Sequence, residues 1–161
     1  TGTGGRHPPG IRPGAPDIFD QRPILEGAEC VGAAADHDQS VGLRNVREGL
    51  VGNDLKMGRI YHDSFKITDP DKVRMSACLL LQSPIEVTGE IGLTSTQKGK
   101  YIVGHFEIAP HDFGKSWQSL FIWMNENGYK KADQNPFEIM HNNYHEHPEK
   151  KCIVDLCIPI E

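Results

Sequence analysis

The sequence lacks any apolar run long enough to cross a membrane. No stretch approaches the ~20 consecutive apolar residues that a transmembrane helix needs. The first residues also lack the apolar segment of a secretion signal, and Gly, Pro, Thr and Arg dominate them instead. The sequence therefore predicts neither a membrane protein nor a secreted one.

An excess of positive charge is also missing. The chain has 17 Lys and Arg residues against 22 Asp and Glu residues, which gives a formal net charge of −5. Proteins that bind nucleic acid usually carry a basic patch. We therefore predict no direct contact between this chain and nucleic acid.

Cysteine is scarce and lacks the spacing of a redox or metal motif. The four cysteines are Cys30, Cys78, Cys152 and Cys157, and none of them forms a CxxC pair. Cys152 and Cys157 are an odd number of positions apart in one expected strand, so their side chains should point to opposite faces. We predict reduced, structural thiols in a cytoplasmic protein.

Motifs for nucleophilic catalysis and metal binding are not evident. There is no GxSxG elbow, and no serine has an obvious His and acid partner. The run "HNNYHEH" supplies His141, His145 and His147, and imidazoles in a turn can bind zinc or nickel. Their spacing fits no familiar zinc pattern, so an exposed hairpin turn is the preferred interpretation. We predict no metal and no cofactor.

The 161 residues divide into a short tail and one domain. Residues 1–17, which begin "TGTGGRHPPGIRPGAP", have too little apolar surface to offset the entropy of ordering them. We interpret them as a disordered tail, a linker or a cloning remnant. Residues 18–161 have the usual size of a single domain.

Hydrophobic periodicity predicts an α+β domain. Strands are predicted at 30–35, 58–64, 73–82, 100–108, 136–140 and 150–160, with one more short strand within 83–99. A helix at 40–55 is weakened by two glycines. A clearer helix within 111–129 has Asp112 as a plausible N-cap and Gly128 as a plausible stop. Its apolar stripe consists of Phe113, Trp117, Leu120, Phe121 and Met124.

The two halves of the chain repeat the same order of elements. A shift of 79 positions places Ile60 on Ile139, His62 on His141 and Cys78 on Cys157. We therefore predict a duplicated β-α-β-β unit, with repeat one at about 18–82 and repeat two at about 87–161.

Alternation along the strand "PFEIM" raises the question of what Glu138 faces. Because neighbouring side chains point to opposite faces, Phe137 and Ile139 share one face, and we assign them to the helix-covered core. Glu138 and Met140 then point into a groove between the repeats, with Arg59 and Tyr61 as their counterparts. A solvated strand position, or a pair with Arg59 or a lysine, is the alternative for Glu138.

The segments "GKYIVGHFEIAPHDFGKSWQSLFIWMNENGY", "PFEIMHNN" and "CIVDLCIPI" resemble the second repeat of the GyrI-like small-molecule-binding proteins. In the first half, "IYHDS" followed by "DKVRMSACLLL" resembles the hallmark of the first repeat. The same module serves as the effector-binding domain of AraC- and MerR-type regulators. The resemblance covers about residues 18–161 and is strongest from residue 98 onward.

This resemblance implies an eight-stranded antiparallel curved sheet with two helices on one face and a ligand groove between the repeats. It implies ligands that are flat, often cationic and lipophilic, with Glu138 as the key carboxylate. Tyr61, Trp117, Met140, Arg59 and Phe106 are the other candidate ligand-binding residues. Trp123 is expected at a flank or interface.

Two departures from the family pattern affect the pocket. Met140 stands where the family often has Tyr, and the helix of the first repeat is rich in glycine. Arg59 in the same groove would neutralise Glu138 and weaken a preference for cations.

Three functions follow as hypotheses. The first is a stand-alone protein that senses or sequesters small molecules, as a monomer or a homodimer. The second is a hydrolase that uses Glu138, since some members are reported to hydrolyse reactive natural products. The third is a DNA gyrase inhibitor or the effector half of a transcription regulator.

Overall fold

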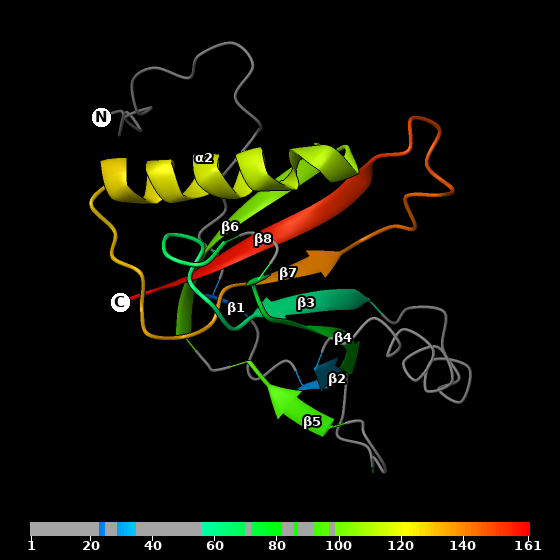
Figure 1. Cartoon of the computed structure of the whole chain (residues 1–161), viewed down its shortest axis with the longest axis horizontal. Coiled ribbons are helices and arrows are strands. Elements are labelled where there is room, and N and C mark those ends of the chain that lie inside the picture. The colour runs from blue at the N-terminus through cyan, green and yellow to red at the C-terminus, as the bar shows by residue number, and fades with distance from the viewer. Residues whose placement is uncertain are drawn as a thin grey trace, which may run out of the picture.

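The computed structural model describes residues 23–24, 29–34, 56–69, 72–81, 86, 92–96 and 99–161. The strands are β1 (Pro23–Ile24), β2 (Glu29–Ala34), β3 (Met57–Tyr61), β4 (Met75–Leu81), β5 (Gly92–Ser95), β6 (Gly99–Ile108), β7 (Phe137–Met140) and β8 (Cys152–Ile160). They form one antiparallel sheet in the order β1-β6-β8-β7-β3-β4-β2-β5 (Figure 1). The predicted α+β class is confirmed.

Helix α2 (Phe113–Glu126) follows a short 3-10 turn at Pro110–Asp112. It begins after Asp112 and ends before Gly128, whose φ of +75° is the left-handed conformation that favours glycine. Both ends agree with the sequence prediction. The Asp112 side chain makes no capping hydrogen bond and lies 3.4 Å from Lys115 Nζ instead.

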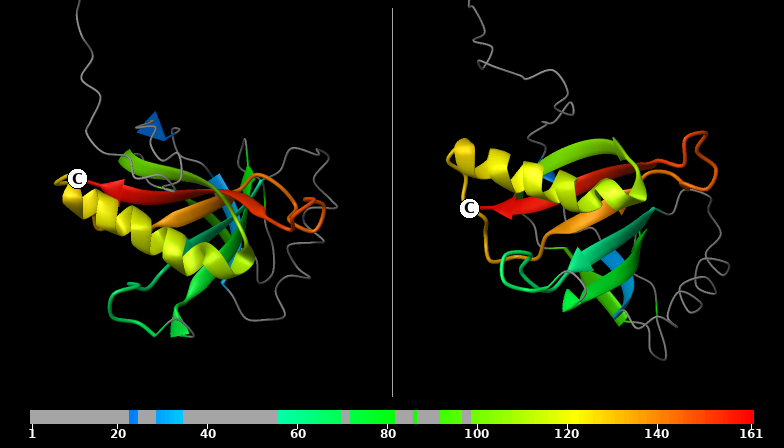
Figure 2. Two further views of the ribbon diagram at one scale, coloured as in Figure 1. Left: turned by 90° about the horizontal axis from the view of Figure 1, so that it is seen from above. Right: turned by 45° about the horizontal axis from the view of Figure 1, so that its top comes forward.

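Helix α2 packs on one face of the sheet, over β6 and β8 (Figures 1 and 2). Trp117, Leu120 and Met124 from the helix join buried residues of the strands in one hydrophobic cluster. The strand members of this cluster are Tyr61, Ile102, Phe106, Val154, Leu156 and Ile158. We call this the helix face.

A second, smaller cluster covers the opposite side of the sheet, which we call the reverse face. Its buried members are Ile60, Cys78, Tyr101, Phe137 and Cys157. Cys157 alternates with Leu156 and Ile158 of the helix face, so Cys152 and Cys157 point to opposite faces as predicted. Cys152 and Cys157 are free thiols.

The assignment of the strand faces from sequence was wrong in one respect. Phe137 and Ile139 belong to the reverse-face cluster, while Glu138 lies on the helix face with Tyr61 and Trp117. Alternation decides which residues share a face, but it does not decide which face the helix covers. The Glu138 site and the helix are therefore on the same side of the sheet, not on opposite sides.

The two halves of the chain meet where β3 pairs with β7. In this register Arg59 stands opposite Glu138, and Gly58 stands opposite Ile139. β7 pairs on its other side with β8, where Glu138 stands opposite Leu156. Glu138 therefore lies at the centre of the sheet, with strands on both sides.

The hairpins that follow β3 and β7 share a hydrogen-bond pattern at a spacing of 79 residues. Asp63 Oδ2 accepts from the Arg74 backbone N–H at 2.8 Å, and Asn142 Oδ1 accepts from the Ile153 N–H at 2.8 Å. The His62 N–H donates to the Arg74 carbonyl at 2.9 Å. At the matching place, the His141 N–H donates to the Ile153 carbonyl at 2.8 Å.

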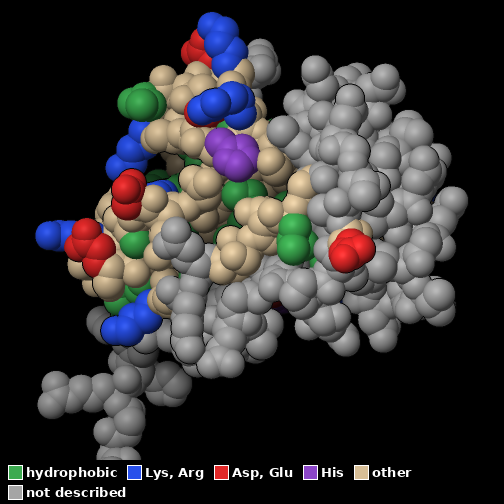
Figure 3. All heavy atoms as spheres, turned by 90° about the horizontal axis from the view of Figure 1, so that it is seen from below, with side chains coloured by type: hydrophobic (Ala, Val, Ile, Leu, Met, Phe, Trp, Pro, Cys, Tyr) green, Lys and Arg blue, Asp and Glu red, His purple; other side chains and the backbone are tan. Residues whose placement is uncertain are grey.

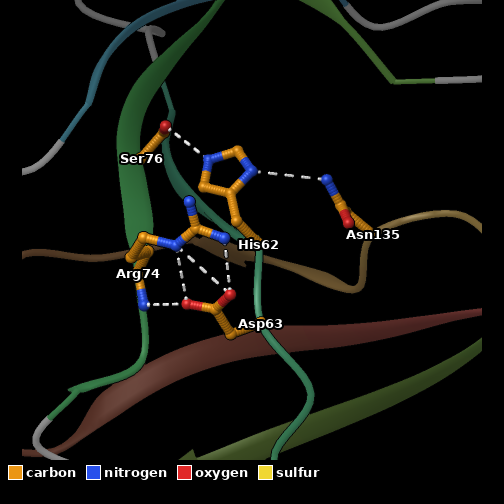
Figure 4. A network of polar contacts seen from close by, with 5 residues as sticks. All are labelled: His62, Asp63, Arg74, Ser76 and Asn135. Atoms are coloured by element: carbon orange, nitrogen blue, oxygen red, sulfur yellow. Dashed lines mark hydrogen bonds and ion pairs between the residues drawn. The ribbon is translucent and has the colours of Figure 1, made fainter. Parts of the chain in front are cut away.

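Charged contacts reinforce the first of these hairpins (Figure 4). Arg74 Nε and Nη2 donate to the Asp63 carboxylate at 2.7 to 3.2 Å. These bonds, with the Arg74 backbone N–H, lower the pKa of Asp63 from its ordinary 3.8 to about 2. On the other side of the hairpin, His62 Nε2 lies 2.7 Å from Ser76 Oγ and Asn135 Nδ2 lies 3.4 Å from His62 Nδ1.

Some predictions lie outside the described residues. These are the tail at 1–17 and the first-half helix at 40–55. No helix in the described part of the chain is long and apolar enough to span a membrane.

Substitution of Gly58 by alanine should destabilise the strand junction. An added Cβ would lie 2.8 Å from the Glu138 carbonyl oxygen and 3.1 Å from Leu80 Cδ1, so β3 and β7 would have to separate. We expect a loss of about 1–3 kcal/mol in the free energy of unfolding, measured by urea denaturation. Gly114→Ala is the matched control because nothing lies within 4 Å of a Cβ added at that position. An unchanged Gly58→Ala midpoint would contradict the close packing of β3 on β7.

The Asp63–Arg74 pair should make stability depend on acid pH. The pKa of Asp63 is lower in the folded state, so its contribution is full above about pH 4 and is lost as pH falls toward 2. Asp63→Asn should therefore lower the melting temperature at pH 6, and the difference from wild type should shrink by pH 2.5. Asp69→Asn, which breaks an exposed pair with Lys72, is the control. If the difference in melting temperature between wild type and Asp63→Asn is the same at both pH values, the charge of Asp63 does not contribute to stability.

Candidate functional site

The centre of the sheet holds a carboxylate that is closed off from solvent. The Glu138 side chain is 0% exposed although it lies on a four-residue strand. Burial of an ionised carboxylate is costly unless charge and hydrogen bonds compensate it. The residues around it therefore decide what this position can do.

Two neighbours from β3 compensate the carboxylate in part. Tyr61 Oη donates a hydrogen bond to Glu138 Oε2 at 3.0 Å, and Arg59 Nη1 lies 3.1 Å from Oε1 in an ion pair. The Arg59 side chain remains 44% exposed, so the guanidinium lies between the buried anion and solvent. The structure thus shows the pair with Arg59 that the sequence left as the alternative interpretation of Glu138.

The compensation is incomplete. Glu138 Oε1 and Trp117 Nε1 are both buried, and neither completes a hydrogen bond in the structure. The indole N–H of Trp117 still lies close enough to favour the charged form of the carboxylate. Two buried polar atoms at one place thus lack a hydrogen bond, although Oε1 keeps its ion pair with Arg59, and this is uncommon in folded proteins.

Aromatic rings surround this carboxylate on the helix face. Tyr61 contacts Phe65 at 4.9 Å and Trp117 at 5.6 Å between ring centroids. Phe65 also contacts Trp117 at 5.3 Å and Phe121 at 6.2 Å. We call Tyr61, Phe65, Trp117 and Phe121 the aromatic wall. A fifth ring, Phe113, lies 5.9 Å from the Arg59 guanidinium carbon.

Burial dominates the electrostatics of the site. It raises the pKa of Glu138, although the Arg59 charge and the Tyr61 and Trp117 side chains act to lower it. Burial, followed by the Glu138 charge, also raises the pKa of the Tyr61 hydroxyl. Tyr61 therefore stays protonated and donates at neutral pH. The arrangement is an anion in a low-dielectric setting beside π faces, which attracts cations strongly.

An open groove was predicted at this place, but the Glu138 side chain is fully buried and the carboxylate does not line one in this structure. A cavity of about 10 Å³ touches Glu138 and Arg59, yet its other lining residues, among them Ile60, Cys78 and Phe137, belong to the reverse face. A wider hollow of about 480 Å³ lies on the reverse face, lined by Ile60, Tyr101 and Phe137 with polar residues of β5 and of 133–135.

Figure 3 shows basic and acidic side chains interspersed over the described part of the face seen from below, with hydrophobic side chains in the recess between them.

The structure brings four of the predicted site residues together. Arg59 and Tyr61 both contact Glu138, and the ring of Trp117 contacts that of Tyr61. Phe106 is buried within the helix-face cluster, and Met140 is partly buried against it.

Trp123 was expected at a flank or interface, and its ring stacks on Tyr129 with the two centroids 5.9 Å apart. Phe65 was missed because it lies in a turn, where no periodicity marks it. Phe113 and Phe121 were identified only as members of the helix stripe, and their place beside Arg59 and Phe65 required the fold.

Solved structures share this fold at low sequence identity. EcmrR in a complex with DNA matches with a TM-score of 0.69 and 12% identity, over 85% of this chain and 55% of that one. The C-terminal domain of EcmrR matches with a TM-score of 0.65 and 14% identity, over 85% of this chain and 93% of that domain. A hydrolase from Listeria innocua matches with a TM-score of 0.56 and 10% identity, over 84% and 88%. The chain thus spans about 55% of the length of the EcmrR chain.

The sequence itself was also compared with known proteins and families. No curated protein sequence matches this chain. The family described as the GyrI-like small molecule binding domain matches residues 29–161, which include both halves of the sheet. The chain belongs to the GyrI-like family of small-molecule-binding domains.

Proposed function

We propose that the Glu138 site binds lipophilic, aromatic cations. The observation that carries this proposal is a fully buried carboxylate with an oxygen that lacks a hydrogen bond, placed beside the aromatic wall. Arg59 occupies the position that a ligand cation would take. Membership of a small-molecule-binding family supports the same use of the site.

Arg59 acts as an internal cation that the ligand replaces. Its side chain is already partly exposed, so it can turn into solvent, whereas Glu138 cannot leave the sheet. At an effective dielectric of about 20 and a separation of ~4 Å, the attraction between cation and carboxylate is about 4 kcal/mol before desolvation. Contact with each π face adds ~0.5–2 kcal/mol.

Binding requires the aromatic wall to move. The Glu138 side chain is 0% exposed, so a ligand cannot reach the carboxylate with the rings in this arrangement, whereas a typical ligand pocket has roughly 300–1,000 Å³. Phe65 lies on the turn between β3 and β4 and is only partly buried, so its displacement uncovers Tyr61 and Trp117. A ligand of about 25 heavy atoms at ~0.3 kcal/mol per atom would then bind with roughly micromolar affinity.

Replacement of the carboxylate should abolish the preference for cations. We expect Glu138→Gln to weaken binding of tetraphenylphosphonium at least tenfold while it leaves binding of a neutral tetraphenyl analogue nearly unchanged. Saturable quenching of tryptophan fluorescence measures both. Glu107→Gln, at an exposed position on the reverse face, is the matched control. Equal affinity of wild type and Glu138→Gln for the cation would remove the carboxylate from the proposal.

Removal of the internal cation should have opposite effects on stability and on affinity. Arg59→Ala leaves the buried carboxylate without its charged partner, so we expect a lower melting temperature without ligand. We also expect tighter binding of the cation, by about tenfold, because no guanidinium has to be displaced. Thermal unfolding with and without tetraphenylphosphonium tests both effects. Weaker binding by Arg59→Ala would mean that Arg59 holds the ligand and does not compete with it.

A hydrolase is the second candidate function. The observation that favours it is the raised pKa of the buried Glu138, which suits a carboxyl group that exchanges protons with water or a leaving group. The structural similarity to a hydrolase from Listeria innocua supports the fold only, at 10% identity. Product formed in excess of protein, and lost in Glu138→Gln, would identify catalysis.

We also infer that the two halves arose by duplication. One support is the hydrogen-bond pattern repeated at a spacing of 79 residues. The other is the strand order: β1, β2, β3 and β4 occupy the same places counted from one edge of the sheet as β5, β6, β7 and β8 occupy counted from the other edge.

The chain matches almost the whole EcmrR C-terminal domain, which supports a role as the effector half of a regulator. Inhibition of DNA gyrase stays a separate prediction, which a supercoiling assay with purified chain tests.

A further inference from the structure

The reverse face carries a group of metal-ligating side chains that the proposed ligand site does not use. His105 on β6, Asp155 on β8 and His141 directly after β7 offer two imidazole nitrogens and a carboxylate. Their ligating atoms all lie within 4.8 Å of one another. Among the described residues, this is the group of three that could hold a metal ion.

The sheet itself brings the three side chains together. His105 stands opposite Asp155 in the pairing of β6 with β8, and Asp155 stands opposite Ile139 in the pairing of β8 with β7. His141 is two positions beyond Ile139 and so points to the same face. Three adjacent strands therefore present three ligands side by side, which gives the group a rigid base.

The carboxylate already contacts both imidazoles. His105 Nδ1 lies 2.6 Å from Asp155 Oδ1, and His141 Nε2 lies 2.7 Å from Asp155 Oδ2. No Lys or Arg of the described residues forms an ion pair with Asp155. The negative charge of Asp155 is therefore available to the two imidazoles or to a bound cation.

We propose that His105, His141 and Asp155 bind one divalent transition-metal ion. Bonds of about 2.0–2.2 Å from nitrogen and carboxylate oxygen suit Zn²⁺, and the same donors suit Ni²⁺ and Cu²⁺. Ligand atoms at these bond lengths and a tetrahedral angle lie about 3.4 Å apart, so each histidine nitrogen must move about 0.7 Å from the carboxylate oxygen and release its proton to water. The His105 side chain is 61% exposed, so its ring has room to turn.

Three protein ligands leave at least one coordination position open. Such an open position is typical of metal sites that bind water or an external ligand, whereas structural zinc sites usually have four protein ligands. The site faces away from Glu138, because Asp155 alternates along β8 with Val154 and Leu156 of the helix face. The proposed ion is therefore separated from the cation site by the thickness of the sheet.

The first half of the chain provides an internal comparison. At the matching places, His62 Nε2 lies 2.7 Å from Ser76 Oγ, and Ser76 pairs in register with Ala34. At these places, which lie within the described residues, the first half has the imidazole of His62, but serine and alanine stand where the second half has Asp155 and His105. The fold alone does not require the three ligands, so their presence in the second half is a property of this sequence.

Titration of the purified, metal-free full chain with Zn²⁺ and Ni²⁺ tests the proposal. Isothermal calorimetry should give one equivalent per chain, with affinity falling at least about 100-fold in His105→Gln, His141→Gln and Asp155→Asn. His62→Gln is the matched control and should bind as wild type does. Loss of binding in His62→Gln, or unchanged binding in the other three variants, would overturn the proposal.

The ligands are identified by a second measurement that does not depend on affinity. With one equivalent of Cu²⁺, electron paramagnetic resonance should show coupling to two imidazole nitrogens in wild type and to one in His105→Gln and His141→Gln. Melting temperatures without metal show whether each variant is folded. A signal that is unchanged in those variants but lost in a His145→Gln, His147→Gln double variant would assign the metal to the turn and refute the site.

Discussion

The ion pair between Arg59 and Glu138 joins the two halves of the molecule, and much of the structure depends on it. The two residues stand opposite each other where β3 meets β7, and they are 79 positions apart, the same spacing that relates the two hairpins. Each is thus the counterpart of the other in its own half. Two like charges at these facing positions would repel each other, and the arginine opposite the glutamate avoids that repulsion.

This arrangement explains why a carboxylate can be buried at the centre of a sheet. Its backbone is held by strands on both sides, so the side chain cannot reach solvent by a local movement. Tyr61 and Arg59 supply a hydrogen bond and a charge, but Oε1 and the Trp117 indole stay without a completed hydrogen bond. A site compensated only in part is easier to open than one in which every polar atom has a partner, because less has to be broken before a ligand enters.

The sequence predicted the parts of this site that follow from local pattern. Alternation placed Glu138 with Arg59 and Tyr61, the stripe of α2 contained Trp117, and the turn residues limited the helix. The face covered by the helix was assigned wrongly, because periodicity carries no information about which layer packs on which side. Phe65 was not found, since a turn has no period. The group of His105, His141 and Asp155 was also missed, because His105 and Asp155 are 50 residues apart and only the pairing of β6 with β8 brings them together.

The two faces of the sheet carry different groups of polar side chains. On the helix face, the first half contributes Arg59, Tyr61 and Phe65, while the second half contributes Glu138 and Trp117, so neither half can form the site alone. On the reverse face, the carboxylate and both imidazoles come from the second half. The Glu138 site is formed at the junction of β3 with β7 and fixes the relative position of the two halves. The group of His105, His141 and Asp155 lies away from this junction, so its residues can change without disturbing the pair of Arg59 and Glu138. Substitutions in the Glu138 site and at the proposed metal ligands should therefore have additive effects on stability, as expected for residues that share no partner.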